Sequence, residues 1–276
     1  MSVKQNFRKL LLVSTSCAFF AACADSSITS PGDTNIGTPP GGGGGTGGGG
    51  SQTTIDLVPA GGCGTGSVRQ ATVVNGDVTI NACEITGNIT QDTVIAQNAG
   101  VLVTGPTFVG SDGGAQVTLE IGAGATLFGS AGSDYMVVAR GSRIEANGTS
   151  AAPIIMTSRQ DVEGTVGAND RGQWGGLIIN GFAPINACID GTAAGGSADC
   201  EKSGEGSSGL FGGDNPADDS GWLRYVQVRY AGFLINNEDE LNGIAFQGVG
   251  SGTDVHHIQV HNNADDGIEM FGGAVD

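Results

Sequence analysis

Short runs of alternating apolar and polar residues recur along most of the chain, each bounded by glycine or asparagine. In the stretch AQVTLEIG, Val117, Leu119 and Ile121 share one face of a strand, while Thr118 and Glu120 share the other. No long stretch after the N-terminal region has a persuasive 3.6-residue period. The pattern therefore predicts an all-β protein built of many short strands.

The spacing of these runs favours stacked parallel strands over a sandwich of two sheets. A solenoid gives a regular repeat without helices between the strands, whereas a sandwich needs hairpin dipeptides, which are scarce here. The steps between successive strand centres are 18, 18, 23, 50, 18 and 14 residues, and the long step indicates an insertion near residues 187–220. The strand centres are Leu119, Val137, Ile155, Ile178, Val228, Phe246 and Val260.

Six segments, taken in order, resemble the secreted or lipid-anchored right-handed parallel β-helix proteins of Gram-negative bacteria, a branch of the pectin-lyase-like architecture. The segments are LEIGAGATLFG, MVVARGSRIEANGTSAAPIIMTS, RGQWGGLIINGFAPIN, GLFGGDNPADDSGWLRYVQVRYAG, LNGIAFQGVGSGT and DDGIEMFGG. The resemblance implies a right-handed parallel β-helix over residues 54–276. It implies no reaction, because this branch has no established one. The family pattern continues past Asp276, so we expect a C-terminally incomplete solenoid.

The first 22 residues have the pattern of an export signal. Basic residues precede an apolar core at residues 10–22 that is too short to span a membrane. The core ends in FAAC, which resembles the lipobox of bacterial lipoproteins and implies acylation of Cys23. The alternative is an ordinary secreted protein cleaved at a small residue. We expect a lipid-anchored protein of the cell envelope, in the outer membrane or at the surface of a Gram-negative bacterium.

A low-complexity segment follows the signal peptide. Residues 23–53 are rich in Ser, Thr, Pro and Gly and include GGGGGTGGGG at positions 41–50. Such a segment cannot bury a core and predicts a flexible tether with a root-mean-square span of about 30 Å. The lipid anchor would thus hold the β-helix domain clear of the bilayer.

The composition is strongly acidic. The 28 Asp and Glu residues outnumber the 11 Lys and Arg residues, for a formal net charge of −17. This charge repels nucleic acid and anionic lipid, so we expect no nucleic-acid partner. It suits divalent cations or cationic partners, and an acidic surface that is simply solvated accounts for it equally well.

Four cysteines remain after Cys17 is cleaved off and Cys23 is acylated. They are Cys63, Cys83, Cys188 and Cys200, and an oxidising compartment keeps such residues in disulfides. Four cysteines allow three pairings. We favour Cys63 with Cys83 and Cys188 with Cys200, because each pair is local and lies in a polar stretch.

The outward positions of several strands predict a polar, partly aromatic stripe. Alternation places Ile258 and Val260 inward, and His257 and His261 outward at a separation of about 13 Å, too far to share a metal ion. The stripe suits an extended glycan or a surface protein, and an ordinary solvated face is the alternative. The candidate binding residues are Tyr225, Gln227, Arg229, Gln247, His257, Gln259 and His261.

Asp265 and Asp266 are the candidate catalytic residues. The segment NADDGIE resembles the Asp-Asp motif of polygalacturonases, which implies an acid/base pair in glycoside hydrolysis. Its cationic companions cannot be placed from the sequence. The alternative is a corner between two sheets of one rung, because only eight residues separate Val260 from Ile268. In that case Ile268 and Met270 point inward.

Calcium is the candidate cofactor. In GGDNPADDSG, the residues Asp214, Asn215, Asp218 and Asp219 offer the hard oxygen ligands that calcium accepts. Asp265, Asp266 and Glu269 form a second candidate set. Loops of this composition also occur as ordinary turns.

Our interpretation is a lipid-anchored β-helix that binds an extended polymer or a surface partner without catalysis of its own. One alternative is a polysaccharide hydrolase or lyase that uses Asp265 or Asp266. Another is an accessory lipoprotein of an outer-membrane uptake system, for which the lipid anchor is the support.

Overall fold

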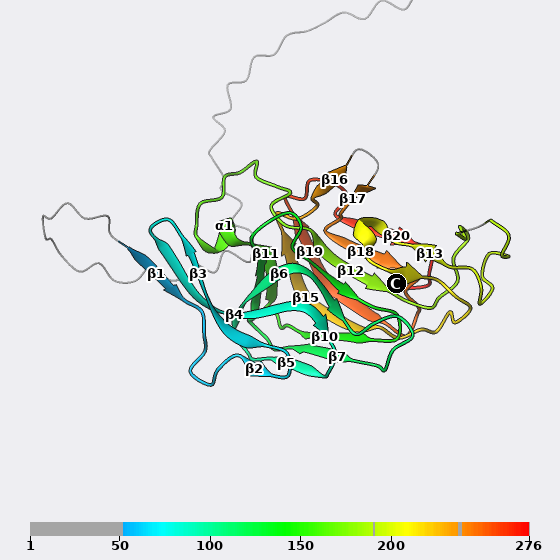
Figure 1. The fold of residues 1–276 in the computed structure, drawn as a ribbon, viewed down its shortest axis with the longest axis horizontal. Coiled ribbons are helices and arrows are strands. Elements are labelled where there is room, and N and C mark those ends of the chain that lie inside the picture. Colours follow the sequence, from blue (N-terminus) through cyan, green and yellow to red (C-terminus); the bar gives the residue numbers. More distant parts are fainter. Residues whose placement is uncertain (1–51, 190, 237–238, 276) are drawn as a thin grey trace, which may run out of the picture. The chain divides into compact units, whose positions relative to one another are not determined.

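The computed structural model describes residues 52–189, 191–236 and 239–275. The expected signal peptide, acylated Cys23 and nearly all of the expected tether lie outside these residues. Most strands pair in parallel and belong to one 16-stranded sheet that winds into a coil (Figure 1). The prediction of an all-β parallel β-helix is therefore confirmed. In the described ranges, no helix has the length and hydropathy that a membrane-spanning segment needs.

The continuous 16-stranded sheet folds into three faces, and each rung of the coil passes through them in turn. We call these faces the first, second and third sheets. The first sheet contains β5 (Thr93–Ile95), β7 (Thr118–Ile121), β10 (Arg143–Asn147) and the first halves of β15 (Gly221–Arg229) and β19 (Asp254–His261). The second contains part of β4 (Val78–Ile89), the first half of β6 (Gly100–Val109), β8 (Thr126–Gly129), β11 (Ile154–Ser158) and the second halves of β15 and β19. The third contains the ends of β4 and β6, then β9 (Tyr135–Val138), β12 (Gly176–Asn180), β18 (Ile244–Gln247) and β20 (Ile268–Phe271).

One rung of the coil is longer than the commonest step, 18 residues, between the predicted strand centres. Leu119 pairs with Ile144, 25 positions on, and Ile244 pairs with Ile268, 24 positions on. The steps of 18 to 23 residues between predicted strand centres are not the rung length, because successive centres lie in different sheets. Leu119 is in the first sheet and Val137, the next predicted centre, is in the third.

Inward side chains stack in apolar columns along the coil. Met136, Leu177 and Ile244 occupy one column of the third sheet, and all three are fully buried. The column continues to Ile268, which is 44% exposed because β20 is the last rung described. The prediction that Ile268 and Met270 face inward is consistent with this register, since Met270 pairs with the buried Phe246.

A small N-terminal sheet covers one face of the coil. β1 (Thr53–Asp56) and β3 (Arg69–Asn75) flank the first half of β4, and β2 (Gly64–Thr65) pairs with β5. Ile55, Ile80 and Val73 lie side by side on the three strands, and their apolar cluster includes Leu102 and Phe128 of the second sheet. In Figure 1 these strands project at the left of the coil. They shield the second sheet from water on its outer face.

Both disulfides form as the sequence analysis favoured. Cys63 is bonded to Cys83, which attaches the N-terminal segment to β4, and Cys188 is bonded to Cys200 within the insertion. Cys63 and Cys83 are both buried among the core residues.

The insertion near residues 187–220 contains an antiparallel pair, β13 (Lys202–Ser203) and β14 (Leu210–Phe211), with the short 3₁₀ helix η1 (Glu205–Ser207) at its tip. A buried arginine, Arg140, clamps its base. The guanidinium donates to Asp112 and Glu201 at 2.7 Å and to the carbonyl oxygen of Gly212 at 2.9 Å. Charge-assisted bonds of this kind are stronger than neutral ones.

Two further excursions leave the coil at its corners. The helix α1 (Arg159–Val162) is capped by Ser158 and follows β11 directly. The hairpin of β16 (Leu234–Asn236) and β17 (Asp239–Glu240) precedes β18. Both lie at the top of Figure 1.

Removing the Cys63–Cys83 bond tests how far the N-terminal segment depends on it. The double variant Cys63→Ser/Cys83→Ser should lose about 3 kcal/mol of unfolding free energy, because the bond closes a loop of 20 residues. Urea unfolding of the oxidised protein measures the change. The matched variant Cys188→Ser/Cys200→Ser controls for loss of a disulfide as such. An unchanged urea midpoint in the first variant would contradict the expectation.

Candidate functional site

An aromatic cluster lies on the outside of the coil where the first sheet meets the second. We call it the aromatic corner, and it consists of Trp222, Tyr225, His256 and His257. Tyr225 and His257 stand at this bend in successive rungs, and both have left-handed backbone conformations, with φ of 51° and 57°. Their rings stack with centroids 4.2 Å apart and planes 18° apart. This separation is close to the spacing of adjacent strands, about 4.8 Å.

The bend also turns His256 outward. His256 pairs with Arg224 in the register of β15 and β19, and both side chains are partly exposed. The Nδ1 atoms of His256 and His257 lie 2.7 Å apart, so that one ring donates to the other. Simple alternation along a straight strand would have placed His256 inside, and sequence reasoning therefore missed it.

Charged groups surround the aromatic corner. Arg224 donates through Nε and Nη2 to Oδ2 of Asp254, at 2.9 and 2.6 Å. His256 Nε2 lies 3.9 Å from the same oxygen. The Trp222 ring lies 5.0 Å from the Arg224 guanidinium and 5.7 Å from that of Arg143. The corner therefore combines flat ring faces with hydrogen-bonding groups of both charges.

Hydrogen bonds hold the tryptophan and its arginine in place. Trp222 donates its indole N–H to Oδ1 of Asn147, on the preceding rung, at 2.7 Å. Arg143 is paired with Asp219, and this hydrogen bond is the largest cause of the raised pKa of Arg143. The Trp222 ring is thus positioned before any ligand arrives.

Six of the seven predicted binding residues lie on the outer face of β15 and β19, and their outward direction agrees with the prediction. Gln259 and His261 are exposed, next to one another on β19. Gln227 is nearly buried because Arg229 folds over it and donates to its Oε1 from Nε at 3.2 Å. Arg229 also lies 3.6 Å from the carboxylate of Asp161, in α1. Gln227 is therefore covered before any ligand arrives.

The placement of Gln247 in an exposed stripe is wrong. Gln247 belongs to the third sheet and is 1% exposed, since the tip of the insertion covers it. Ser208 of that tip lies 3.5 Å from its Oε1. Sequence alternation gives the outward direction of a side chain and carries no information about a loop that later folds over it.

Asp265 and Asp266 lie at a corner, between the second and the third sheets. Both are exposed, and the carbonyl oxygen of Asp266 accepts hydrogen bonds from Gly243 N at 3.0 Å and Asn263 Nδ2 at 2.6 Å. The interpretation of this segment as a corner is confirmed. In the described ranges, Arg224 and Arg229 pair with other carboxylates, so neither supplies the cationic companion that the catalytic hypothesis needs.

Three of the four candidate calcium ligands in the GGDNPADDSG loop are engaged by the protein itself, and the fourth, Asp214, is exposed. Asp218 is buried and accepts from Ser220 Oγ, and burial raises its pKa. Asp219 pairs with Arg143 and caps Gly221 N, and Asn215 Oδ1 accepts from Ala217 N. Within the described part of the chain, no three His, Cys, Asp or Glu residues come together as metal ligands would. The geometry does not support calcium at this loop or at Asp265, Asp266 and Glu269.

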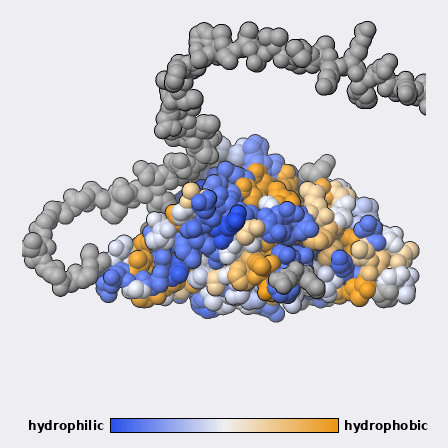
Figure 2. Space-filling view, turned by 90° about the horizontal axis from the view of Figure 1, so that it is seen from above, coloured by the Kyte–Doolittle hydropathy of each residue, from blue (hydrophilic) through white to orange (hydrophobic). Residues whose placement is uncertain are grey.

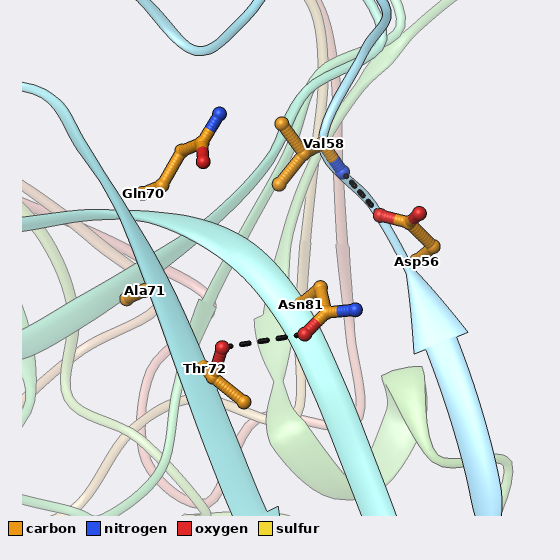
Figure 3. A pocket seen from close by; sticks show the side chains of 6 residues that line it. All are labelled: Asp56, Val58, Gln70, Ala71, Thr72 and Asn81. Atoms are coloured by element: carbon orange, nitrogen blue, oxygen red, sulfur yellow. Dashed lines mark hydrogen bonds between the residues drawn. The ribbon is translucent and has the colours of Figure 1, made fainter.

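A hollow of about 470 Å³ lies on the N-terminal sheet. Figure 3 shows its polar lining, in which Thr72 donates to Asn81 across β3 and β4, and Asp56 accepts from the backbone of Val58. Gln70 lines the same hollow. The hollow is open and has no aromatic residue in its lining, so it makes a weaker candidate than the aromatic corner.

The side of the molecule on which α1 and β16–β17 lie carries both hydrophilic and hydrophobic residues. In Figure 2 the hydrophilic residues gather at the left and in the middle of the view, and hydrophobic patches lie in the middle and over much of the right half. Leu234 and Ile235 of β16 are 53% and 40% exposed.

One comparison with known proteins gives a match. A family model described as a pectate-lyase like β-helix domain matches residues 87–276. No curated protein and no solved structure matches the chain. The matched residues begin near the end of β4 and run through all later rungs, including the aromatic corner.

The calcium hypothesis has a direct thermal test. We expect the melting temperature to be the same in calcium chloride and in EDTA at equal ionic strength, because Asn215, Asp218 and Asp219 are already bonded within the protein. A site-bound ion would raise the melting temperature by mass action. A magnesium series controls for nonspecific screening of the acidic surface. A rise of several degrees in calcium alone would overturn this expectation.

Proposed function

The chain belongs to the pectate-lyase-like β-helix family, and from this premise we propose that it is a lipid-anchored protein of the cell envelope that binds an extended glycan at the aromatic corner. It carries out no chemistry of its own on that glycan. The lipid is attached at Cys23, and the segment that follows holds the domain away from the membrane.

The stacked pair Tyr225 and His257 is the observation that carries this proposal. Aromatic rings offer large, rigid apolar faces, and neighbouring polar groups fix the orientation of a ligand. Sugars present both kinds of surface, with C–H groups on one face of the ring and hydroxyl groups around it. The corner places Trp222, Arg224 and His256 next to the stacked pair, so both parts of a sugar find partners.

The row of exposed side chains along β19 favours a polymer over a single sugar. Gln259 and His261 follow His257 along the outer face of β19. At about 3.3 Å per residue, the distance from His257 to His261 is about 13 Å, more than the length of one sugar unit. A chain of several units would touch the aromatic corner and these exposed side chains together.

Binding without cleavage fits the groups at the corner better than glycoside hydrolysis. Hydrolysis needs one protonated carboxylic acid and one carboxylate on opposite sides of the scissile bond. The ion pair of Arg224 engages Asp254, and Asp265 and Asp266 lie at a different corner.

A polysaccharide hydrolase or lyase is the second candidate, and the cluster of Arg224, Asp254 and His256 favours it. These three groups lie together next to aromatic rings, as acid/base and charge-stabilising groups do in many active sites. They are better placed for this role than Asp265 and Asp266. An accessory role in an outer-membrane uptake system stays a third hypothesis, and the expected anchor at Cys23 is its support.

A panel of neutral and uronate polysaccharides tests binding and cleavage together. We expect the full-length protein to bind at least one polymer without shortening it. Tyr225→Asn and His257→Asn should each weaken binding about two- to tenfold, since an aromatic contact contributes about 0.5–1.5 kcal/mol. Asparagine tolerates the left-handed conformation at both positions, so the fold is kept. Affinity electrophoresis measures the change.

The control is Val74→Ser, an exposed position on β3 away from the corner. Binding unchanged in both corner variants would overturn the proposed site. If the wild type released reducing or unsaturated ends and Asp254→Asn did not, the protein would be an enzyme and not only a binding protein.

The anchor has its own test. Cys23→Ser should move the protein from the membrane fraction to the soluble fraction, because no acyl chain can then be attached. Cys17→Ser is the matched control and should leave the protein with the membranes, since this residue lies in the cleaved segment. Immunoblots of fractionated cells give the distribution. Full retention of Cys23→Ser in membranes would contradict the lipid anchor.

A further inference from the structure

Two excursions of the chain meet over the outer face of the third sheet. The tip of the insertion, residues 204–208, packs against Leu241 and against β17 of the other excursion. Gly206 N donates to Asp239 Oδ1 at 2.9 Å, and Tyr135 donates its hydroxyl to Gly206 O at 2.5 Å. We call residues 204–208 the lid.

The lid covers apolar and polar side chains of the third sheet. The apolar side chains near it form a cluster of Tyr135, Val137, Ile178, Leu241 and Ala245, all nearly buried. Asn180 donates to the carbonyl oxygen of Ser208 at 2.7 Å, and Gln247 lies against Ser208 Oγ. Displacement of the lid would expose part of this face to water.

Glycines connect the lid to a firmly held base. Glycine occupies positions 204, 206 and 209, and the last two have φ of 64° and 99°. Below them, Arg140 clamps Glu201 and Gly212, and the ring of Phe211 lies 5.9 Å from that of Phe271. The base of the hairpin is therefore held by ionic and aromatic contacts, while the tip is held by hydrogen bonds and by packing against Leu241.

The charges at the lid repel one another. The hydrogen bond from Gly206 N to Asp239 Oδ1 places the lid beside β17, and the carboxylates of Glu269, Asp239, Glu240 and Asp265 act electrostatically on Glu205, in the lid. Tyr135 of β9 faces the lid as a neutral hydroxyl at neutral pH, and burial together with Asp239 raises its pKa. The four strongest charges acting on Glu205 are thus all carboxylates, and like charges at close range disfavour ionisation.

We propose that the lid is a pH-sensitive closure of the third sheet, closed while Glu205 is protonated and loosened when Glu205 loses its proton. Ionisation adds one more negative charge to a partly buried group of carboxylates. The lid can relieve this repulsion by moving toward water, because its glycines allow the motion and its base stays in place.

The titration of Glu205 supports this device and fixes its direction. Burial, followed by Glu269, Asp239, Glu240 and Asp265, raises the pKa of Glu205 from 4.5 to about 7. A group with a raised pKa in the closed state binds its proton more tightly there. Closure is therefore favoured fully below pH 4.5 and is lost as the pH rises through about 7.

Hydrogen exchange of the backbone amides in the lid tests the proposal. Protection factors, corrected for the intrinsic pH dependence of exchange, are measured by mass spectrometry on peptides spanning residues 204–211 between pH 5 and pH 9. In the wild type we expect protection to fall at least tenfold across this range, with a midpoint near pH 7. Peptides from β12 should keep constant protection.

Glu205→Gln is the decisive variant, because glutamine keeps the shape of the side chain and cannot ionise. Its lid should stay protected across the whole range. Glu120→Gln, an exposed carboxylate on β7, is the matched control and should behave as the wild type. Constant protection of the wild-type lid, or an unchanged midpoint in Glu205→Gln, would overturn the proposal. Glycan binding at the aromatic corner is measured separately and does not affect this test.

Discussion

Hydrogen bonding between neighbouring rungs is the interaction on which the rest of the structure depends. A strand such as β12 finds its backbone partners in β9, one rung before it, and in β18, one rung after it. Parallel partners must stay in register, so side chains one rung apart fall into columns. Inward columns such as Met136, Leu177 and Ile244 become the core, and outward positions become stacks such as Tyr225 and His257.

The fold could be predicted from the sequence because both of its main signals are local. Alternation around Leu119 gives the strand, and the absence of helices between strands gives the solenoid. The rung length could not be predicted, because a rung contains three strands and the sequence does not say which sheet a strand joins. Leu119 and Val137 follow each other in sequence and lie in different sheets. The disulfide pairing could be predicted because each pair is close in sequence.

The site could be predicted only in part. Tyr225, His257 and His261 point outward, as alternation along a straight strand predicts. The bend at His257 therefore leaves no trace in the alternation of these residues. That bend brings His256 and its neighbour Arg224 to the surface. Left-handed backbone at a tyrosine or histidine has no clear sequence signal, since glycine and asparagine are the usual residues there. Burial of Gln247 depends on an insertion that begins far away in the chain, so no local pattern reports it.

The clamp at Arg140 has a consequence for the order in which the protein folds. Its partners Glu201 and Gly212 lie 61 and 72 residues further along the chain, and Asp112 lies 28 residues before it. Closing such loops costs entropy, and the guanidinium is in position only after β9 and β10 have joined their rungs. The insertion therefore docks late, after the coil has formed. We also expect it to detach first on unfolding, as a unit that its own disulfide crosslinks.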